Sequence, residues 1–281
     1  MLLSKEVLLS YQAATFRTQP GMHLASVDEA VDYINQRGFI LFWPDKSIVM
    51  PSLWSAVAGN RPVADEHDDP GHVSWGWKDG LLGKRLCYYG RVLRKRNTFI
   101  SLQMLPVFYA LSPNYGDPNE DYLIEYEQGQ LTLGAKLVYE ALLKEGPQDS
   151  IALRKAARLT GNDSEFNRAL ETLQITFRVL PIGVSQAGAW HYSFIYDIVA
   201  RYLPDLLEQA RPISEFEARR RLITCYLATV GAAREKDIQR VFGWPAPLVE
   251  REITKLVAQN AVRAGVQVEG EKGDWLASPL V

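Results

Sequence analysis

The strongest chemical signal in the sequence is a run of basic side chains between residues 78 and 96. The run holds seven Lys or Arg residues against one acidic residue, Asp79, and Tyr88 and Tyr89 lie among them. Clusters of cationic side chains bind phosphate groups, and interleaved aromatic rings can stack on bases. The alternative is a solvated helix end, where basic residues are also favourable. We expect the run to face a polyanion through Lys84, Arg85, Arg91, Arg94, Lys95 and Arg96.

Three tryptophans are candidates for a pocket that accepts a distorted base. Trp75 and Trp77 flank Gly76, and Trp43 ends the apolar run Phe39–Trp43. Exposed indole rings stack on bases, whereas buried indole rings anchor a hydrophobic core. Both interpretations fit this pattern, and the core role is the more common one.

The loop Asp65–His72 combines four carboxylates with two histidines. Such groups can bind a divalent cation. Their spacing matches no tight structural metal site, so an exposed acidic loop is the simpler interpretation. The sequence also lacks the Cys-x-x-Cys, His-Glu-x-x-His, Gly-x-Ser-x-Gly and Gly-rich phosphate-loop patterns. We therefore expect no metal and no cofactor.

The overall composition is that of a globular protein without a global charge bias. Of the 281 residues, 47% are hydrophobic and 23% are charged, and the net charge is −2. This balance excludes a mostly disordered chain and leaves nucleic-acid binding to local patches. The charge is segregated, because Asp117–Glu145 carries seven acidic and two basic residues.

Cysteine content and apolar runs indicate a cytoplasmic protein without membrane contact. The two cysteines, Cys87 and Cys225, cannot form a disulfide framework. Lys5 and Glu6 come too early for the core of a signal peptide. The longest clean apolar run, Phe39–Trp43, is far shorter than the ~20 residues that a transmembrane helix needs.

The clearest organisational signal is an internal repeat. Residues 132–196 and 214–278 share the order of an amphipathic helix, a short helix, a third helix and a β-hairpin. Most equivalent positions lie 85 residues apart, as in the pairs Leu137 with Leu222, Arg178 with Arg263 and Trp190 with Trp275, and those of the third helices, such as Phe166 and Val249, lie 83 apart. Three short helices followed by a two-stranded wing is the winged-helix order. The alternative is two unrelated helix-rich segments.

A winged helix usually lays its third helix in the major groove of DNA. Polar residues off the inner stripe of each third helix are therefore candidate DNA contacts, and they are Asn167, Arg168 and Thr172 in the first repeat and Arg251, Thr254 and Lys255 in the second. Residues 211–263 carry ten basic and six acidic residues, a local excess that fits phosphate contact. A solvated helix face or a protein-binding winged helix remains the alternative.

The N-terminal half shows a weaker version of the same order. Ser26 with Glu29 three residues later is a capping-box pattern, so a helix is expected from Ser26 to Gly38. Phe39–Trp43 then predicts a strand, and Ser47–Met50 predicts its return partner in a hairpin. With Ser4–Phe16 as its first helix, this region predicts a third, degenerate winged helix.

The expected fold class is mainly α with small β-hairpins (α+β), built from tandem winged-helix domains. The expected domains are an N-terminal helical or degenerate winged-helix region with the basic patch at residues 1–130, a winged helix at 131–205 and a winged helix at 211–281.

The sequence resembles the winged-helix DNA glycosylases of the AlkZ/YcaQ type. The resemblance rests on the repeated C-terminal units, on the helix-to-strand passage Gln36–Ile40 and on the Leu53–Trp54 pair. The segments Trp75–Asp79 and Leu102–Pro106 are similar to those of an uncharacterised side branch of that family. The resemblance implies tandem winged helices around a DNA-binding cleft, with double-stranded DNA, including damaged duplex, as the partner.

One departure from the family pattern concerns its catalytic motif. Family members that excise alkylated bases carry Gln-x-Gln or Gln-x-Asp just after the Gly-aromatic passage, where this chain reads Leu41-Phe42-Trp43. Asp45, two residues on, is the weak catalytic candidate if the register shifts. We therefore expect a DNA-binding relative that lacks the usual motif. The alternatives are an active glycosylase that uses Asp45, a protein-binding scaffold and a transcription regulator.

Overall fold

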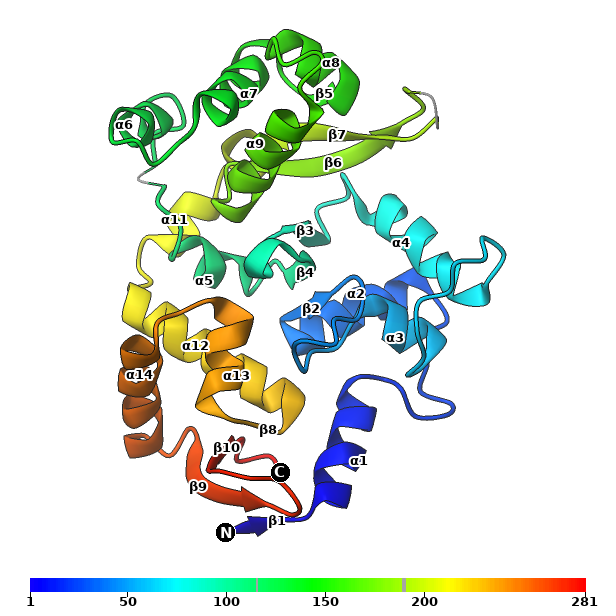
Figure 1. The fold of residues 1–281 in the computed structure, drawn as a ribbon, viewed down its shortest axis with the longest axis vertical. Coiled ribbons are helices and arrows are strands. Elements are labelled where there is room, and N and C mark those ends of the chain that lie inside the picture. Colours follow the sequence, from blue (N-terminus) through cyan, green and yellow to red (C-terminus); the bar gives the residue numbers. More distant parts are fainter. Residues whose placement is uncertain (115, 189–190) are drawn as a thin grey trace.

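Short helices and three small sheets make up the described residues, which are 1–114, 116–188 and 191–281 of the computed structural model. Three stretches share one element order: a helix, a short strand, two helices and a β-hairpin (Figure 1). The first unit contains α2 (Val27–Arg37), β2 (Phe39–Leu41), α3 (Leu53–Ala58), α4 (Val73–Leu81), β3 (Cys87–Arg91) and β4 (Asn97–Ser101). The second unit contains α7 (Leu133–Glu145), β5 (Gln148–Asp149), α8 (Ser150–Ala156), α9 (Asp163–Ile175), β6 (Val179–Ser185) and β7 (Ser193–Ile198). The third unit contains α12 (Glu215–Val230), β8 (Ala232–Ala233), α13 (Glu235–Phe242), α14 (Ala246–Ala258), β9 (Arg263–Val268) and β10 (Trp275–Ala277).

The remaining elements connect or cover these units. They are β1 (Leu2–Leu3), α1 (Lys5–Thr15), η1 (Pro70–His72), η2 (Leu93–Lys95), α5 (Leu105–Tyr109), α6 (Asp121–Glu127), α10 (Val199–Tyr202) and α11 (Leu206–Ala210). No helix in the described part of the chain is long and apolar enough to cross a membrane.

Each unit closes its sheet in the same way. The short strand that follows the first helix pairs antiparallel with the last strand of the hairpin, which gives the orders β2-β4-β3, β5-β7-β6 and β9-β10-β8. In the third unit β1 extends the sheet, because Leu2 and Leu3 pair in parallel with Gln267 and Val268 of β9. The fold is therefore mainly α with small β-hairpins, as the sequence predicts.

The repeat predicts the helices of the second and third units well. Asn162 caps α9 by accepting from the Glu165 N–H, and Pro245 stands at the cap of α14. The first helices occur as α7 and α12, each with an inward apolar stripe. Trp190, expected in the second hairpin strand, lies outside the described residues, and β7 begins at Ser193. The domain boundaries at 130, 205 and 211 stay a prediction.

The prediction for the N-terminal region is wrong in two respects. Ser47–Met50 is not a strand, because the Asp45 carboxylate accepts from the Ser47 N–H and turns the chain, and β2 pairs with β4 instead. The helix at Ser4–Phe16 occurs as α1, but it packs on α12 rather than opening the first unit. Tyr11 Oη donates to the Ala228 carbonyl at 2.6 Å in this contact. The first helix of the unit is α2, which Ser26 caps as expected.

The first and third units share one hydrophobic cluster. It joins Phe39 and Ile100 of the first sheet to Leu222 and Tyr226 of α12, with Phe108 of α5 between them. The second unit has its own cluster beneath α7 and α9, and its Phe177 and Leu180 also belong to the shared cluster. Burial of apolar surface therefore fixes the first and third units against each other as one body.

Gly38 is a point where this joint tolerates no side chain. It ends α2 with φ +76°, and a Cβ there would lie 2.7 Å from Cys225 Sγ on α12. Gly146 ends α7 with φ +82° and has nothing within 4 Å of such a Cβ. The two glycines thus differ in packing but share the left-handed backbone that disfavours other residues.

We expect Gly38→Ala to lower the free energy of unfolding by about 2–4 kcal/mol, because overlap with α12 adds to backbone strain. Gly146→Ala, the matched control, should cost only about 1–2 kcal/mol from strain. Urea denaturation measures both values. Equal losses in the two variants, or no recovery of Gly38→Ala in a Cys225→Ala background, would contradict the packing of α2 on α12.

Candidate nucleic-acid interface

The tip of the β3–β4 hairpin lies where the three units meet. Its turn, η2, packs against α9 of the second unit and α13 of the third unit. The Arg91 N–H donates to Gln174 Oε1 of α9 at 3.2 Å, and Arg94 Nη1 donates to the Arg240 carbonyl of α13 at 3.3 Å. Arg94 and Lys95 both have positive φ values, 48° and 72°, so the backbone turns sharply between the two helices.

Five cations from two units gather at this tip: Arg91, Arg94, Lys95, Arg96 and Arg240. Three carboxylates oppose them, since Glu171 lies 3.5 Å from Arg91 and 2.7 Å from Lys95, Asp45 pairs with Arg96, and Asp237 lies 3.7 Å from Arg240. We call these eight residues the junction cluster. The side chains of Lys95, Arg240 and Arg91 are 66%, 48% and 46% exposed, so their charges remain open to solvent.

The basic run is divided by β3. Lys84 and Arg85 precede this strand, and the Arg85 guanidinium lies over the Tyr202 ring, 4.9 Å from its centroid. The cations from Arg91 to Arg96 follow the strand and join the junction cluster. Lys78 is buried and cannot face a phosphate. The single continuous surface expected from the sequence is thus two separate groups.

The candidates on the third helices are exposed, but they differ in their partners. Asn167 and Arg168 face solvent on α9, and Arg168 Nε donates only to the Ser164 carbonyl of its own helix. Arg251 lies 2.9 Å from Glu252 and stacks over Phe216, whereas Lys255 is exposed and its side chain has no partner among the described residues.

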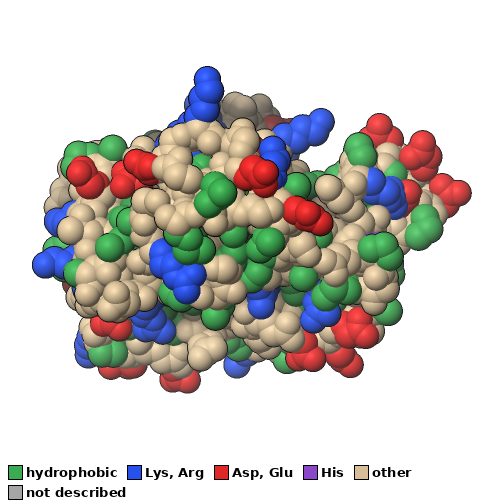
Figure 2. Space-filling model, turned by 90° about the horizontal axis from the view of Figure 1, so that it is seen from below, with side chains coloured by type: hydrophobic (Ala, Val, Ile, Leu, Met, Phe, Trp, Pro, Cys, Tyr) green, Lys and Arg blue, Asp and Glu red, His purple; other side chains and the backbone are tan. Residues whose placement is uncertain are grey.

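Most basic residues of the segment 211–263 lie close to a carboxylate. Seven of its ten basic residues lie between 2.7 and 3.7 Å from a carboxylate, namely Arg211, Arg219, Arg220, Arg221, Arg234, Arg240 and Arg251. On the face shown in Figure 2, acidic and basic side chains are interspersed with apolar ones. The net charge of this segment therefore does not show where its unpaired cations lie.

The structure brings together two of the three candidate tryptophans. The ring centroids of Trp43 and Trp75 lie 5.8 Å apart, and Trp75 is 40% exposed. Trp77 packs on the core of the first unit instead. Trp54, which is fully buried, packs against Trp43, with ring centroids 5.4 Å apart.

Lys78 is the centre of an aromatic cage that the sequence analysis did not anticipate. Its Nζ lies 4.5–5.9 Å from five ring centroids, those of Phe42, Trp75, Tyr89, Tyr192 and Phe194. Nζ donates to Tyr192 Oη at 2.7 Å and lies 2.6 Å from the Asp79 carboxylate. The cage joins α4 to the hairpin of the second unit.

A helical stripe could have revealed the burial of Lys78. Ser74, Lys78 and Leu81 recur at i, i+4 and i+7, and all three are buried. Burial lowers the pKa of the Lys78 ammonium, and the hydrogen bond and charge of Asp79 act in the opposite direction. Rings around a desolvated ammonium stabilise it further through cation–π attraction.

The catalytic motif position holds no proton-transfer group. Leu41 and Phe42 are buried at the end of β2, and Phe42 forms one wall of the Lys78 cage. Asp45 instead lies at the edge of the junction cluster, bonded to Ser47 and Arg96. Burial acts to raise the pKa of Asp45, but the hydrogen bonds from Ser47 and Arg96 outweigh it, so the pKa is lowered.

The acidic loop does not assemble a metal site. Asp69 accepts from Arg61 and from the Gly71 N–H at 2.7 Å, and His72 Nε2 lies 3.0 Å from the Ala64 carbonyl. Within residues 1–114, 116–188 and 191–281, no three His, Cys, Asp or Glu side chains are placed to hold a metal ion.

Comparison with known proteins decides the family. The model of the AlkZ-related family matches residues 24–243, which include the whole first and second units and most of the third unit's helices. The chain belongs to the AlkZ-related family. The AlkZ-related chain also resembles the solved structure of Streptomyces sahachiroi DNA glycosylase AlkZ, with a TM-score of 0.63 and 13% identity, over 100% of this chain and 71% of that one. At this identity the likeness shows a shared fold. No curated protein matches the chain.

We expect Asp79→Asn to destabilise the protein more than Lys78→Met does. Asp79→Asn leaves a desolvated ammonium without its counter-charge and should lower the free energy of unfolding by about 2–4 kcal/mol. Lys78→Met removes the buried charge and fills the cage with a similar volume, so it should cost less than about 1.5 kcal/mol. Guanidinium denaturation compares the two; the reverse order would show that Lys78 is not held as a buried cation.

We expect the contribution of Asp45 to stability to be lost in acid. Its folded-state pKa is lowered, so the stabilisation is fully present above the unfolded value of 3.8 and disappears as pH falls through the folded value. Asp45→Asn should therefore cost about 1 kcal/mol at pH 7 and progressively less below about pH 4. A difference between the two proteins that stays constant from pH 7 to pH 2.5 would contradict this pairing.

Proposed function

We propose that this AlkZ-related protein binds double-stranded DNA through tandem winged helices, with the junction cluster as its main phosphate-contacting surface. The helix–strand–helix–helix–hairpin order of all three units supports the winged-helix interpretation. The observation that carries the proposal is that the exposed side chains of Arg91, Lys95 and Arg240 converge on one turn. This turn, η2, lies between α9 of the second unit and α13 of the third unit.

The physical argument concerns how the cations are held. Arg91 and Lys95 share one carboxylate, Glu171, so at least one positive charge is in excess at that point. Arg94 has no carboxylate partner among the described residues and donates only to a backbone carbonyl. Exposed ion pairs exchange readily with phosphate, because they contribute little to folding stability.

The other candidate residues would extend the DNA contact beyond the junction cluster. Arg168 lies one helical turn before Glu171 on α9, and Lys255 offers an unpaired ammonium on α14. Lys84 and Arg85 extend the contact beyond the start of β3. Trp75 presents an exposed ring beside Trp43, where an unstacked or distorted base could rest.

The affinity of the full chain for a short undamaged duplex should fall steeply with salt. Replacing Arg91, Arg94 and Lys95 together by Gln should reduce the slope of log K against log salt by up to about 2.7, since each lost phosphate contact removes about 0.9. Fluorescence anisotropy measures both. The matched control neutralises Lys144, Lys155 and Arg211, which are exposed elsewhere.

Two results would overturn the proposal. Salt-independent or absent binding would favour a protein-binding scaffold, and equal slopes in the two triple variants would remove the junction cluster from the interface. A preference for one base sequence, together with a dimer, would favour a transcription regulator. Repetition with an alkylated or abasic duplex shows whether damage strengthens binding.

Base excision by Asp45 is a second candidate function. The observation in its favour is the position of this carboxylate, ionised at neutral pH, at the edge of the surface proposed to hold DNA. An ionised carboxylate can stabilise an oxocarbenium-like centre or orient a water molecule. Against it, Arg96 and Ser47 already occupy the carboxylate.

Release of an alkylated base from duplex DNA tests this candidate directly. Asp45→Asn should abolish release without weakening duplex binding, because it removes a carboxylate and no cation from the junction cluster. If wild type releases no base, or if Asp45→Asn releases base at the wild-type rate, Asp45 is not a catalytic group.

A further inference from the structure

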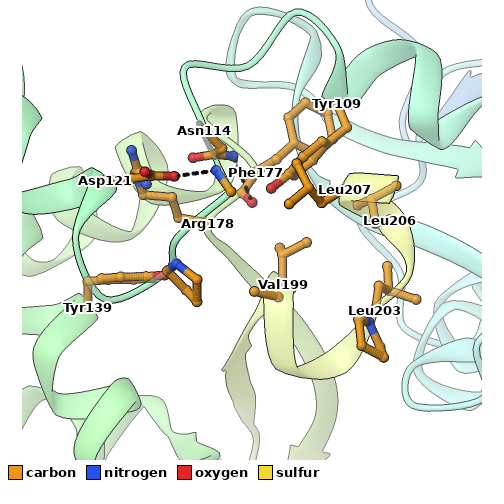
Figure 3. A pocket seen from close by; sticks show the side chains of 14 residues that line it. Tyr109, Asn114, Asp121, Tyr139, Phe177, Arg178, Val199, Leu203, Leu206 and Leu207 are labelled. Atoms are coloured by element: carbon orange, nitrogen blue, oxygen red, sulfur yellow. Dashed lines mark hydrogen bonds between the residues drawn. The ribbon is translucent and has the colours of Figure 1, made fainter. Parts of the chain in front are cut away.

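A separate pocket lies away from the proposed DNA interface, where α5, the start of α6 and the α10–α11 segment meet the second unit. Its volume is about 200 Å³. Figure 3 shows Asn114, Asp121 and Arg178 gathered on one side of it and Leu203, Leu206 and Leu207 on the other. The pocket is therefore divided into a polar wall and an apolar wall.

Aromatic rings complete the enclosure. Tyr109, Tyr139 and Phe177 line the space between the two walls. Tyr109 and Phe177 belong to one ring cluster, with centroids 6.2 Å apart, and the Arg178 guanidinium lies 6.0 Å from the Tyr139 centroid. A flat ligand would meet ring faces or aliphatic side chains on most sides.

The polar wall contains buried hydrogen-bonding groups that the fold leaves unused. Arg178 is 3% exposed, and among the described residues its Nε has no hydrogen-bond acceptor, whereas its Nη2 is engaged in an ion pair with Glu125. Asn114 Nδ2 donates to the Thr176 carbonyl at 2.8 Å, which fixes the amide, while its Oδ1 is buried without a donor. Unused buried groups of this kind cost about 1–3 kcal/mol each, so they are expected to have a partner.

Charge restricts the class of that partner. Arg178 Nη2 lies 2.8 Å from the Glu125 carboxylate, and both side chains are at most 6% exposed. Asp121 adds a second carboxylate to the wall and accepts from the Gly116 N–H at 2.8 Å. With two carboxylates around one guanidinium, an anion such as phosphate would be repelled, and a neutral ligand is favoured.

We propose that this pocket binds a single neutral nucleobase or a heteroaromatic ring of that size. A ring acceptor would meet the Arg178 Nε–H, a ring or exocyclic N–H would meet Asn114 Oδ1, and the ring faces would lie against the aromatic and leucine side chains. Arg and Asn are the side chains that form paired hydrogen bonds with base edges. A pocket below the roughly 300–1,000 Å³ of drug-sized ligand sites suits one such ring. The proposal does not depend on the duplex-binding function.

Isothermal titration of the full chain with adenine, hypoxanthine, cytosine and uracil tests it. At least one base should bind saturably with 1:1 stoichiometry. Arg178→Lys keeps a positive charge beside Glu125 but removes the unused Nε–H donor, and it should weaken binding about tenfold or more. Leu203→Trp adds bulk at the half-buried apolar wall and should weaken binding to a similar extent.

Arg154→Lys is the matched control, because Arg154 is paired with Asp163 in the same unit but lies outside the pocket. It should leave base affinity within about twofold, since a surface ion pair has little effect elsewhere. Circular dichroism checks that every variant is folded. The absence of saturable binding for all four bases, unchanged affinity in both pocket variants, or competition by inorganic phosphate would overturn the proposal.

Discussion

The turn at Arg94 and Lys95 is the point where all three units meet. Two successive residues with positive φ are unfavourable for side chains with a Cβ, so the surrounding structure has to hold them there. It does so from two sides, through Gln174 and Glu171 of α9 and through the Arg240 carbonyl of α13. The same backbone turn that joins the units therefore also fixes the directions of its cationic side chains.

The Lys78 cage is a second joint of a different kind. The junction cluster is an exposed electrostatic contact, which salt weakens, whereas the Lys78 side chain at the centre of the cage is only 1% exposed. The hairpin of the second unit is thus held to α4 by interactions that ionic strength hardly affects. If the junction cluster binds DNA as we propose, salt that screens its phosphate contacts would leave this second joint intact.

Much of the helical framework could be predicted, because caps and apolar stripes are local signals. Ser26, Asn162 and Pro245 mark the helix starts that the structure shows. The short strands β5 and β8 carry too few residues for an alternating pattern, and the partner of β2 lies more than fifty residues further along the chain. The candidate site was less predictable, because net charge along a segment does not reveal which cations face a carboxylate from another unit, as Lys95 faces Glu171. The burial of Lys78 was indicated only by its place on the same helical stripe as Ser74 and Leu81. A charged side chain on such a stripe is normally expected to face solvent.

The parallel pairing of β1 with β9 has a consequence for how the molecule is made. Leu2 and Leu3 contact Gln267 and Val268, and α1 packs on α12, so segments near the two ends of the sequence complete one sheet. During synthesis β1 leaves the ribosome long before its partner strand β9. β1 must therefore wait, unpaired, until β9 has emerged, and closing this contact carries the entropic cost of a loop of more than 250 residues. Docking of β1 is accordingly expected as a late step of folding, after each helical unit has formed from its own local contacts.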